Sequence, residues 1–274
     1  MHIYAIGDLH FSGVPESKPM DVFGEHWKGH RPRIIENWKQ TVTPEDTVIL
    51  CGDISWAIKL PDAVKDDLCE IAALPGKKVM LRGNHDYWWT GLSKMKKATG
   101  DAFFFLQNNF CAIEDEGMQI AVCGSRGWLT PDCEGYKPET DDAILRHEEL
   151  RIRASLDAAQ QAGITEIILA LHYPPFYSME EDSIFKQLID EYGVKTCVFG
   201  HIHGAEGAAA ILKDSGTAVP ISLSPATPRG LRRYESAEAE IVWPRTRRPG
   251  RRCRPVPKRV NHLIQSEADA VRTK

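Results

Sequence analysis

Short apolar runs in this sequence are followed directly by side chains that can bind metal ions or transfer protons. In the stretch from Val79 to Trp89, VMLRGNHDYWW, an apolar run stops at Gly83, and an asparagine, a histidine and an aspartate follow in a turn. Glycine lets the backbone leave a strand sharply. Four other expected strand ends offer groups of the same kinds. Together they give these candidate metal ligands: Asp8, His10, Asp53, Asn84, His172, His201 and His203.

The candidate ligands supply carboxylate oxygens, an amide oxygen and imidazole nitrogens, and they include no thiolate. Such a set suits Mn, Fe or Zn in a reactive site rather than a structural zinc site built from cysteines. Seven groups exceed what one ion needs. The expected cofactor is therefore a pair of divalent metal ions (Mn, Fe or Zn) that share a bridging carboxylate. Two ions about 3.5–4 Å apart are a known device for hydrolysing phosphate esters.

The elements that must position these groups alternate between strand and helix in the first half of the chain. Apolar runs predict strands at residues 3–6, 47–50 and 77–81, and helical spacing predicts helices at 31–41 and 60–74. This order is typical of parallel α/β units, which bind ligands beyond the carboxyl ends of their strands. If strand geometry persists beyond Ile6, Asp8 and His10 point to the same side, because side chains two residues apart share a strand face.

The second half of the chain predicts further strands and helices. Strands are expected at 103–105, 111–113, 119–123, 166–171 and 195–199, and helices at 91–99, 141–162 and 183–192. The strand at 119–123 ends in the sequence GSRGW, and the strand at 166–171 ends at His172.

The order of the motifs resembles the calcineurin-like metallophosphoesterase superfamily, whose pattern is D-x-H, G-D, G-N-H-[DE], a lone histidine and G-H-x-H. The corresponding segments here are Asp8-Leu9-His10, Gly52-Asp53, Gly83-Asn84-His85-Asp86, His172 and Gly200-His201-Ile202-His203, within residues 1–205. The segments GDISWA, GNHDYWW, GSRGW and HYPP are similar to a bacterial subgroup of predicted phosphohydrolases. The resemblance implies an α/β fold in which two packed β-sheets, a β-sandwich, are flanked by helices in four layers.

The resemblance also implies a role for each candidate residue. Asp8, His10 and His203 would hold one metal ion, Asn84, His172 and His201 would hold the other, and Asp53 would bridge them. His85 would donate a proton to the leaving group. A metal-bridging hydroxide would attack phosphorus, and the ions would neutralise the phosphate oxygens. The implied substrate is a phosphate ester, and the motifs do not distinguish a monoester from a diester. Two alternatives are a catalytically silent metal-binding scaffold of the same fold and a metal-dependent nuclease.

Several residues near the motifs have two interpretations each. Asp86 either caps a turn and orients a neighbour or takes part in catalysis. Arg126 either contacts the substrate phosphate or pairs with acids of the long helix at 141–162. Four tryptophans either stack on an aromatic leaving group or pack in the core or rim: Trp56, Trp88, Trp89 and Trp128.

The strand and helix pattern fails after about Leu212. We therefore expect a metallophosphoesterase domain over residues 1–212, an irregular continuation over 213–244 and a basic Arg/Pro-rich tail over 245–274 whose composition predicts disorder. This tail carries a net charge of +8, which leaves −12 on the remainder of the chain. An acidic body has no overall attraction for nucleic acid. The tail either binds RNA or other anionic surfaces, or is an altered end.

Composition places the chain among ordinary globular proteins, with 42% hydrophobic and 26% charged residues. Its apolar runs are shorter than the roughly 20 residues that a membrane-spanning helix needs, so no membrane partner is expected. The seven cysteines are scattered without a C-x-x-C pair, which predicts free thiols and a reducing cytoplasm. No partner protein can be deduced from the sequence.

Overall fold

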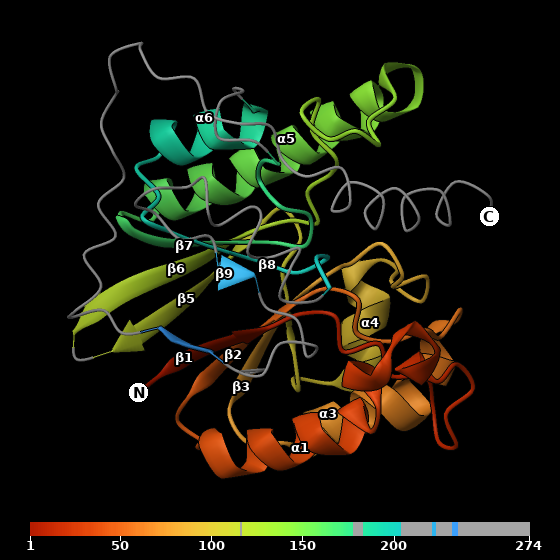
Figure 1. The fold of residues 1–274 in the computed structure, drawn as a ribbon. Helices are drawn as coiled ribbons and strands as arrows, with labels where there is room; N and C mark the ends of the chain where they lie inside the picture. Colours follow the sequence, from red (N-terminus) through yellow and green to blue (C-terminus); the bar gives the residue numbers. More distant parts are fainter. Residues whose placement is uncertain (116, 178–182, 204–220, 223–231, 235–274) are drawn as a thin grey trace.

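The computed structural model describes residues 1–115, 117–177, 183–203, 221–222 and 232–234. Two five-stranded β-sheets pack face to face, with helices on the outer face of each (Figure 1). The expected α/β fold, a two-sheet sandwich flanked by helices, is confirmed.

The first sheet is built from the first half of the chain and has the strand order β10-β1-β2-β3-β4. Its parallel strands are β1 (Ile3–Ile6), β2 (Thr47–Cys51), β3 (Lys77–Leu81) and β4 (Phe104–Phe105), and β10 (Arg232–Tyr234) pairs antiparallel with β1. The helices of this half are α1 (His30–Thr41), α2 (Leu60–Ala63), α3 (Cys69–Ala73) and α4 (Leu92–Thr99), together with two 3₁₀ turns, η1 (Met20–Phe23) and η2 (Glu25–Trp27). The helix expected over 60–74 contains a π-helical turn, η3 (Val64–Leu68), between α2 and α3.

The second sheet has the strand order β5-β6-β7-β8-β9. Its strands are β5 (Phe110–Asp115), β6 (Met118–Gly124), β7 (Glu166–Leu171), β8 (Thr196–Phe199) and β9 (Ile221–Ser222), of which only the β5–β6 pair is antiparallel. The long helix α5 (Pro138–Gln161) and α6 (Ile184–Glu191) cover its outer face (Figure 1).

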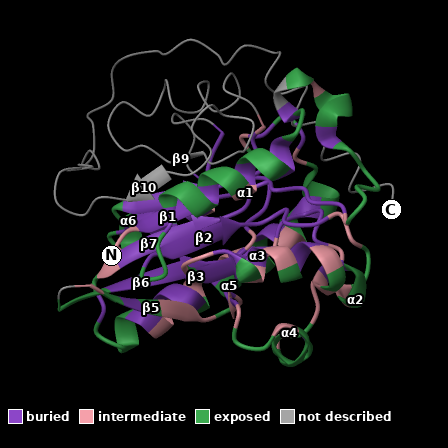
Figure 2. Cartoon of the chain, turned by 90° about the horizontal axis from the view of Figure 1, so that it is seen from below, coloured by how far each residue is buried: buried purple, intermediate pink, exposed green. Residues whose placement is uncertain are grey.

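Alternation along the strands produces three apolar layers. Ile3 and Ala5 of β1 pack against the second sheet, and Tyr4 and Ile6 pack against the helices on the other face. Because both faces are covered, β2 is buried along its whole length, as is typical of parallel strands (Figure 2). Burial on both faces explains why β2 is apolar from Val48 to Cys51.

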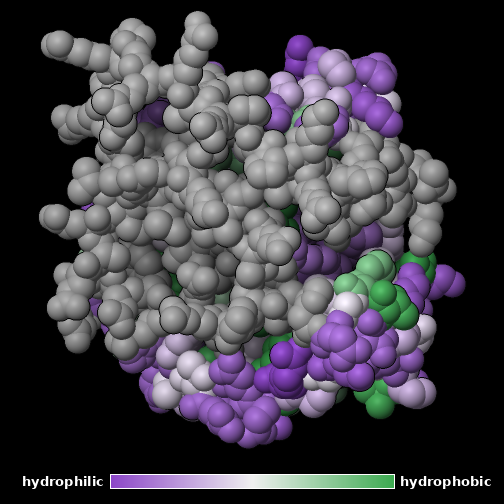
Figure 3. Space-filling view, viewed as in Figure 1, coloured by the Kyte–Doolittle hydropathy of each residue, from purple (hydrophilic) through white to green (hydrophobic). Residues whose placement is uncertain are grey.

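Large hydrophobic side chains are sparse on the described surface. The exposed ones are Val14, Val22, Phe23, Ile58, Met118 and Leu150. Figure 3 shows the described lower part of the molecule as mostly hydrophilic with small hydrophobic spots. No helix among the described residues has the length and apolarity to cross a membrane.

Little of the chain beyond His203 is among the described residues. Two short segments there add one strand to each sheet, because β9 pairs with β8 and β10 pairs with β1. The tail over 245–274 and most of the segment over 213–244 lie outside the described residues. The predicted division into 1–212, 213–244 and 245–274 therefore stays a prediction.

Candidate metal centre and active site

The loops after β1 and β2 are joined by backbone hydrogen bonds. The amide of Asp8 donates to the carbonyl of Gly52 at 2.9 Å, and the amide of His10 donates to the carbonyl of Asp53 at 2.9 Å. The backbone of Asp8, His10 and Asp53 is left-handed, with φ of 57°, 48° and 53°. Strand geometry therefore does not persist beyond Ile6. Asp8 and His10 come together because their loop is bent against the next one, not because they share a strand face.

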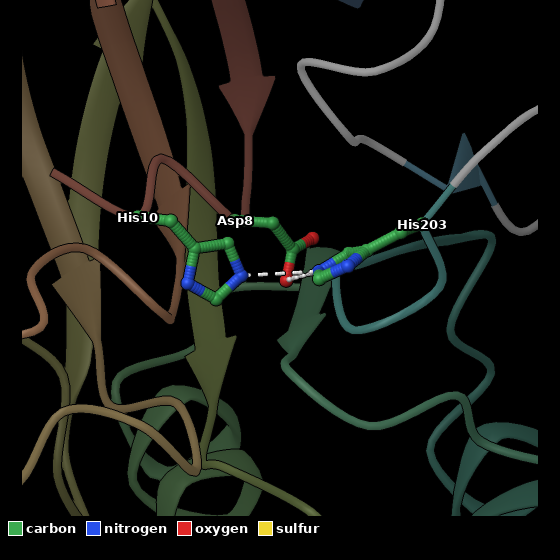
Figure 4. Close-up of side chains that lie close together, drawn as sticks. All are labelled: Asp8, His10 and His203. Carbon is green, nitrogen blue, oxygen red and sulfur yellow. Dashed lines mark hydrogen bonds and ion pairs between the residues drawn. The ribbon is translucent and has the colours of Figure 1, made fainter. Parts of the chain in front are cut away.

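The first cluster of candidate ligands is formed by Asp8, His10 and His203 (Figure 4). Their ligand atoms lie within 4.8 Å of one another. Nε2 of His10 is 3.1 Å from Nε2 of His203, and Nε2 of His203 is 3.3 Å from Oδ1 of Asp8. Residues separated by 193 positions in the sequence thus meet at one point.

The second cluster is formed by Asn84, His172 and His201. Oδ1 of Asn84 lies 2.5 Å from Nε2 of His172 and 3.1 Å from Nδ1 of His201. Oδ2 of Asp53 is 3.6 Å from Nε2 of His172 and 3.8 Å from Nε2 of His10. Asp53 therefore lies between the two clusters. The two clusters and Asp53 together account for all seven candidate ligands from the sequence.

Hydrogen bonds orient two of these side chains. Nδ1 of His172 is 2.9 Å from the carbonyl oxygen of Cys51, which can only accept, so Nδ1 carries the proton and Nε2 is left with a lone pair. The amide of His201 donates to both carboxylate oxygens of Asp8, at 3.0 and 2.9 Å. Both arrangements fix the direction of a ligand atom independently of any ion.

The donor set fits divalent cations. With Nδ1 of His172 protonated, its Nε2 and Oδ1 of Asn84 both offer lone pairs and lie 2.5 Å apart, so both atoms could bind the same cation. Burial lowers the pKa of His10 and His172 well below its usual range, and neighbouring histidines add to the shift. Burial raises the pKa of Asp53, as do the charges of Asp86 and Asp8. Neutral imidazoles with free lone pairs, beside carboxylates that need positive charge, are the ligands that Mn, Fe or Zn would take.

Asp86 holds two loops of the site together. Its Oδ2 accepts from the amides of Gly83 at 2.7 Å and Asp53 at 2.9 Å. Its Oδ1 accepts from the amides of Ile54 at 2.8 Å and Ser55 at 3.2 Å, and from the indole of Trp88 at 3.0 Å. The side chain is fully buried. These contacts match the interpretation of Asp86 as an orienting residue.

His85 lies beside Asp53, the carboxylate between the two clusters. Its amide donates to Oδ1 of Asp53 at 2.8 Å, and its Nε2 is 4.0 Å from Oδ2 of the same carboxylate. Its ring packs against Trp56 with centroids 4.3 Å apart. The backbone bond fixes His85 relative to the carboxylate between the two clusters.

Of the four candidate tryptophans, only Trp56 contacts histidines of the site. It stacks on His10 with ring centroids 5.0 Å apart. The indoles of Trp88, Trp89 and Trp128 donate to Asp86, Gln107 and Asp141. Trp88 and Trp128 are buried, so these two pack in the core.

Sequence reasoning missed Trp27. Its ring is buried in edge contact with His10 and His203, at centroid distances of 5.8 and 5.2 Å. No motif marks it, because it lies in a segment rich in glycine and proline without a regular period.

Arg126 contacts the long helix, as one of its two interpretations expects. Its Nη2 is 3.6 Å from Oε1 of Glu148 on α5, and its guanidinium lies over the ring of Trp128 at 4.4 Å. Its carbonyl accepts from the amides of His172 and Tyr173, both at 2.9 Å. Contact between Arg126 and a substrate phosphate, the other interpretation, stays a prediction.

Carboxylates and imidazoles thus cluster beyond the strand ends of two packed sheets and form a candidate metal site. The chain belongs to the calcineurin-like phosphoesterase family, whose model matches residues 1–205. The family and the candidate ligands together support the general class of metal-dependent phosphoesterases.

Several solved structures are similar at low sequence identity. The calcineurin-like phosphoesterase YfkN from Bacillus subtilis is 15% identical with a TM-score of 0.48, over 99% of this chain and 98% of that one. The protein of unknown function AQ665 from Aquifex aeolicus is 21% identical with a TM-score of 0.38, over 72% and 87%. The protein TT1561 of Thermus thermophilus is 13% identical with a TM-score of 0.48, over 74% and 82%. No curated protein matches the chain.

Proposed function

We propose that this chain hydrolyses phosphate esters with two divalent metal ions. The observation that carries the proposal is the position of Asp53, whose Oδ2 lies 3.8 Å from His10 in one cluster and 3.6 Å from His172 in the other. One carboxylate within reach of two separate ligand groups is the arrangement that a pair of ions requires. Mn, Fe and Zn are the ions that suit the donors.

The ligand roles follow from the two clusters. Asp8, His10 and His203 would hold one ion, and Asn84, His172 and His201 the other, with Asp53 shared between them. When bound, the ions supply charge that neutralises the phosphate oxygens and lower the pKa of a water that acts as the nucleophile.

The chain's own groups orient the reaction around this centre. His85 is bound to Asp53 through its backbone amide, and its Nε2 lies 4.0 Å from Oδ2 of Asp53, which supports a position beside the ions rather than a role as a ligand. There it would donate a proton to the leaving oxygen. Arg126 is the candidate for substrate binding, because guanidinium groups bind phosphate in a bidentate manner. Substrate phosphate therefore meets ions on one side and these two side chains at the border.

Metal content and turnover test the proposal together. The metal-free protein is reconstituted with Mn, excess ion is removed, and bound metal is measured by elemental analysis. Turnover is measured on p-nitrophenyl phosphate and bis(p-nitrophenyl) phosphate, which separates monoesterase from diesterase activity. Two ions per chain are expected, whereas at most one tightly bound ion contradicts the proposal.

The variant Asp53→Ala tests the shared ligand. It should lower metal content at both positions and reduce turnover by more than the about 10–100-fold that outer-shell changes cost. Loss of a single ion would show that Asp53 is not the bridge. The matched control is Asp46→Asn, a buried carboxylate that directly precedes β2, at the opposite end of that strand from the site. It should leave the metal content unchanged.

A further inference from the structure

Two half-buried aromatic side chains contact His85, the proposed proton donor. The ring of Trp56 packs against the imidazole with centroids 4.3 Å apart, and the ring of Tyr87 meets the same imidazole edge-on at 6.3 Å. Trp56 and Tyr87 are each partly accessible, whereas the side chain of His85 is only 8% exposed. A ligand that reaches the imidazole of His85 would therefore meet these two rings.

Other aromatic rings beside the centre are closed to solvent. Trp27 contacts His203 at a centroid distance of 5.2 Å, and Tyr173 lies 4.2 Å from the ring of His201. Both Trp27 and Tyr173 are 1% exposed, so they pack around candidate ligands and offer no surface to a substrate. The accessible aromatic surface lies instead beside the proposed proton donor.

Three contacts fix the position of Trp56. Its backbone amide donates to the carbonyl of Phe11 at 2.8 Å, and its indole donates to Sδ of Met20 at 3.4 Å. The ring also stacks on His10 with centroids 5.0 Å apart and an angle of 24° between the planes. A side chain that is already held in place loses little conformational freedom when it binds a ligand, and this favours affinity.

The exposed side chain of Lys18 lies over the same indole, with Nζ 4.8 Å from the ring centroid. A cation over an exposed aromatic ring contributes about 2–5-fold to an equilibrium, whereas a planar ring stacked on an aromatic side chain contributes about 5–150-fold. A planar group can therefore replace this ammonium on the indole, because the flexible stem of lysine lets the charge return to water.

Proton donation determines where the leaving group must lie. In the proposed reaction His85 donates to the leaving oxygen, which must come within about 2.6–3.2 Å of the imidazole. The group attached to that oxygen then lies beside the rings of Trp56 and Tyr87, because both rings contact the same imidazole. These two residues therefore border the space of the leaving group.

We propose that Trp56 and Tyr87 form a subsite for a planar aromatic leaving group, which stacks on Trp56. Aromatic pairs gain from stacked or edge-to-face geometry beyond the area that they bury, and a saturated group of the same size gains nothing of this kind. This inference rests on the proposed function and narrows its substrate class to phosphate esters with an aromatic ring close to the ester oxygen.

Calorimetric binding to the Mn-loaded protein tests the subsite without requiring turnover. Benzylphosphonate and 2-phenylethylphosphonate carry an aromatic ring, and cyclohexylmethylphosphonate and 2-cyclohexylethylphosphonate are their saturated partners. The saturated ring has at least as much apolar area, so burial alone gives the aromatic ring no advantage. At the better spacer length the aromatic ligand should bind about 2–10-fold more tightly than its saturated partner.

Variants locate the effect. Trp56→Leu and Tyr87→Leu should each bring the ratio of the two affinities closer to one, whereas Trp56→Phe should keep most of the preference because it keeps a ring. The matched control is Trp89→Leu. Trp89 is also half-buried, but its ring packs against Phe105 at 5.4 Å and its indole donates to Gln107 at 3.3 Å. This variant should keep the wild-type ratio. All variants are compared at equal metal content.

The outcomes separate the subsite from the activity. Equal binding of the aromatic and saturated ligands at both spacer lengths overturns the inference. A preference that survives in both Trp56→Leu and Tyr87→Leu also overturns it, because the aromatic ring then binds elsewhere. If Trp56→Leu does not fold, Trp56→Phe and Tyr87→Leu carry the test, and an unchanged ratio in Tyr87→Leu then counts against the subsite. A protein that shows the expected ratios but hydrolyses no phosphate ester keeps the aromatic subsite and loses the proposed function.

Discussion

Replacing Asp86 by asparagine should destabilise the protein and weaken metal binding together. One carboxylate oxygen accepts three donors and the other accepts two. A carboxamide has a single accepting oxygen, so whichever way it is oriented at least two buried N–H groups face an NH₂ group. Each unsatisfied buried donor costs about 1–3 kcal/mol, which gives a loss of about 2–6 kcal/mol in the free energy of unfolding. The melting temperature should fall by on the order of 10 °C.

Metal affinity reports the positioning role separately from stability. Because Asp86 binds the amides of Asp53 and Gly83, its loss should shift the shared ligand relative to Asn84 and lower affinity by about 10–100-fold. Affinity is measured by titration with Mn at a temperature where all variants are folded. Asp46→Asn is the control, because the buried carboxylate of Asp46 also accepts two backbone amides, from His2 at 2.6 Å and Thr43 at 2.8 Å.

The control should lose comparable stability and keep its metal affinity. Two results would refute the reasoning. One is an unfolding free energy of Asp86→Asn within about 0.5 kcal/mol of wild type, the range of an unimportant surface change. The other is an equal loss of metal affinity in the Asp86 and Asp46 variants, which would make the effect on the metal a consequence of general destabilisation.

Three further predictions concern single residues. His85→Ala should lower turnover by about 10²–10⁴-fold on an alkyl phosphate ester and far less on a p-nitrophenyl ester, because p-nitrophenolate leaves without a proton. An equal loss on both esters would assign His85 to the phosphoryl group or the ions. Gly83→Ala should remove bound metal, because its Cβ would collide with the amide and carboxylate of Asp53. The control is Gly91→Ala, which should keep its metal because the space around its Cβ is open. Elemental analysis compares the metal content of the two variants. Burial alone would raise the pKa of Asp46, but hydrogen bonds to its carboxylate lower it below the ordinary 3.8. The ionised carboxylate of Asp46 therefore stabilises the folded protein above that pH, and this stabilisation is lost as the pH falls below it. Acid should lower the unfolding free energy of the wild type more than that of Asp46→Asn. Urea titrations in which both proteins lose stability in parallel with acid would contradict this.

The sequence predicts the strands and the edge where the ligands gather. The strand predicted at 77–81 is observed at Lys77–Leu81. Its signal is the apolar run Val79, Met80 and Leu81, whose side chains are all buried, because a strand covered on both faces is apolar where it is buried. The π-helical turn at Val64–Leu68 has no such signal. It contains Asp67, which is buried and accepts from Arg31 at 2.8 Å and from Ser55 at 2.6 Å. Such partners are distant in the chain, and helical periodicity carries no information about them.

The directions of the ligands lie beyond sequence reasoning for a related reason. In the described part of the chain, five non-glycine residues have positive φ, and four of them are proposed ligands: Asp8, His10, Asp53 and His201. A left-handed conformation costs about 1–2 kcal/mol for such residues, so local preference opposes it. Bonds between loops hold it instead, as when His10 donates to Asp53 and His201 donates to Asp8. Strain of this kind persists only where the surroundings determine the backbone. The protein itself therefore sets the backbone of these four candidate ligands before any ion binds.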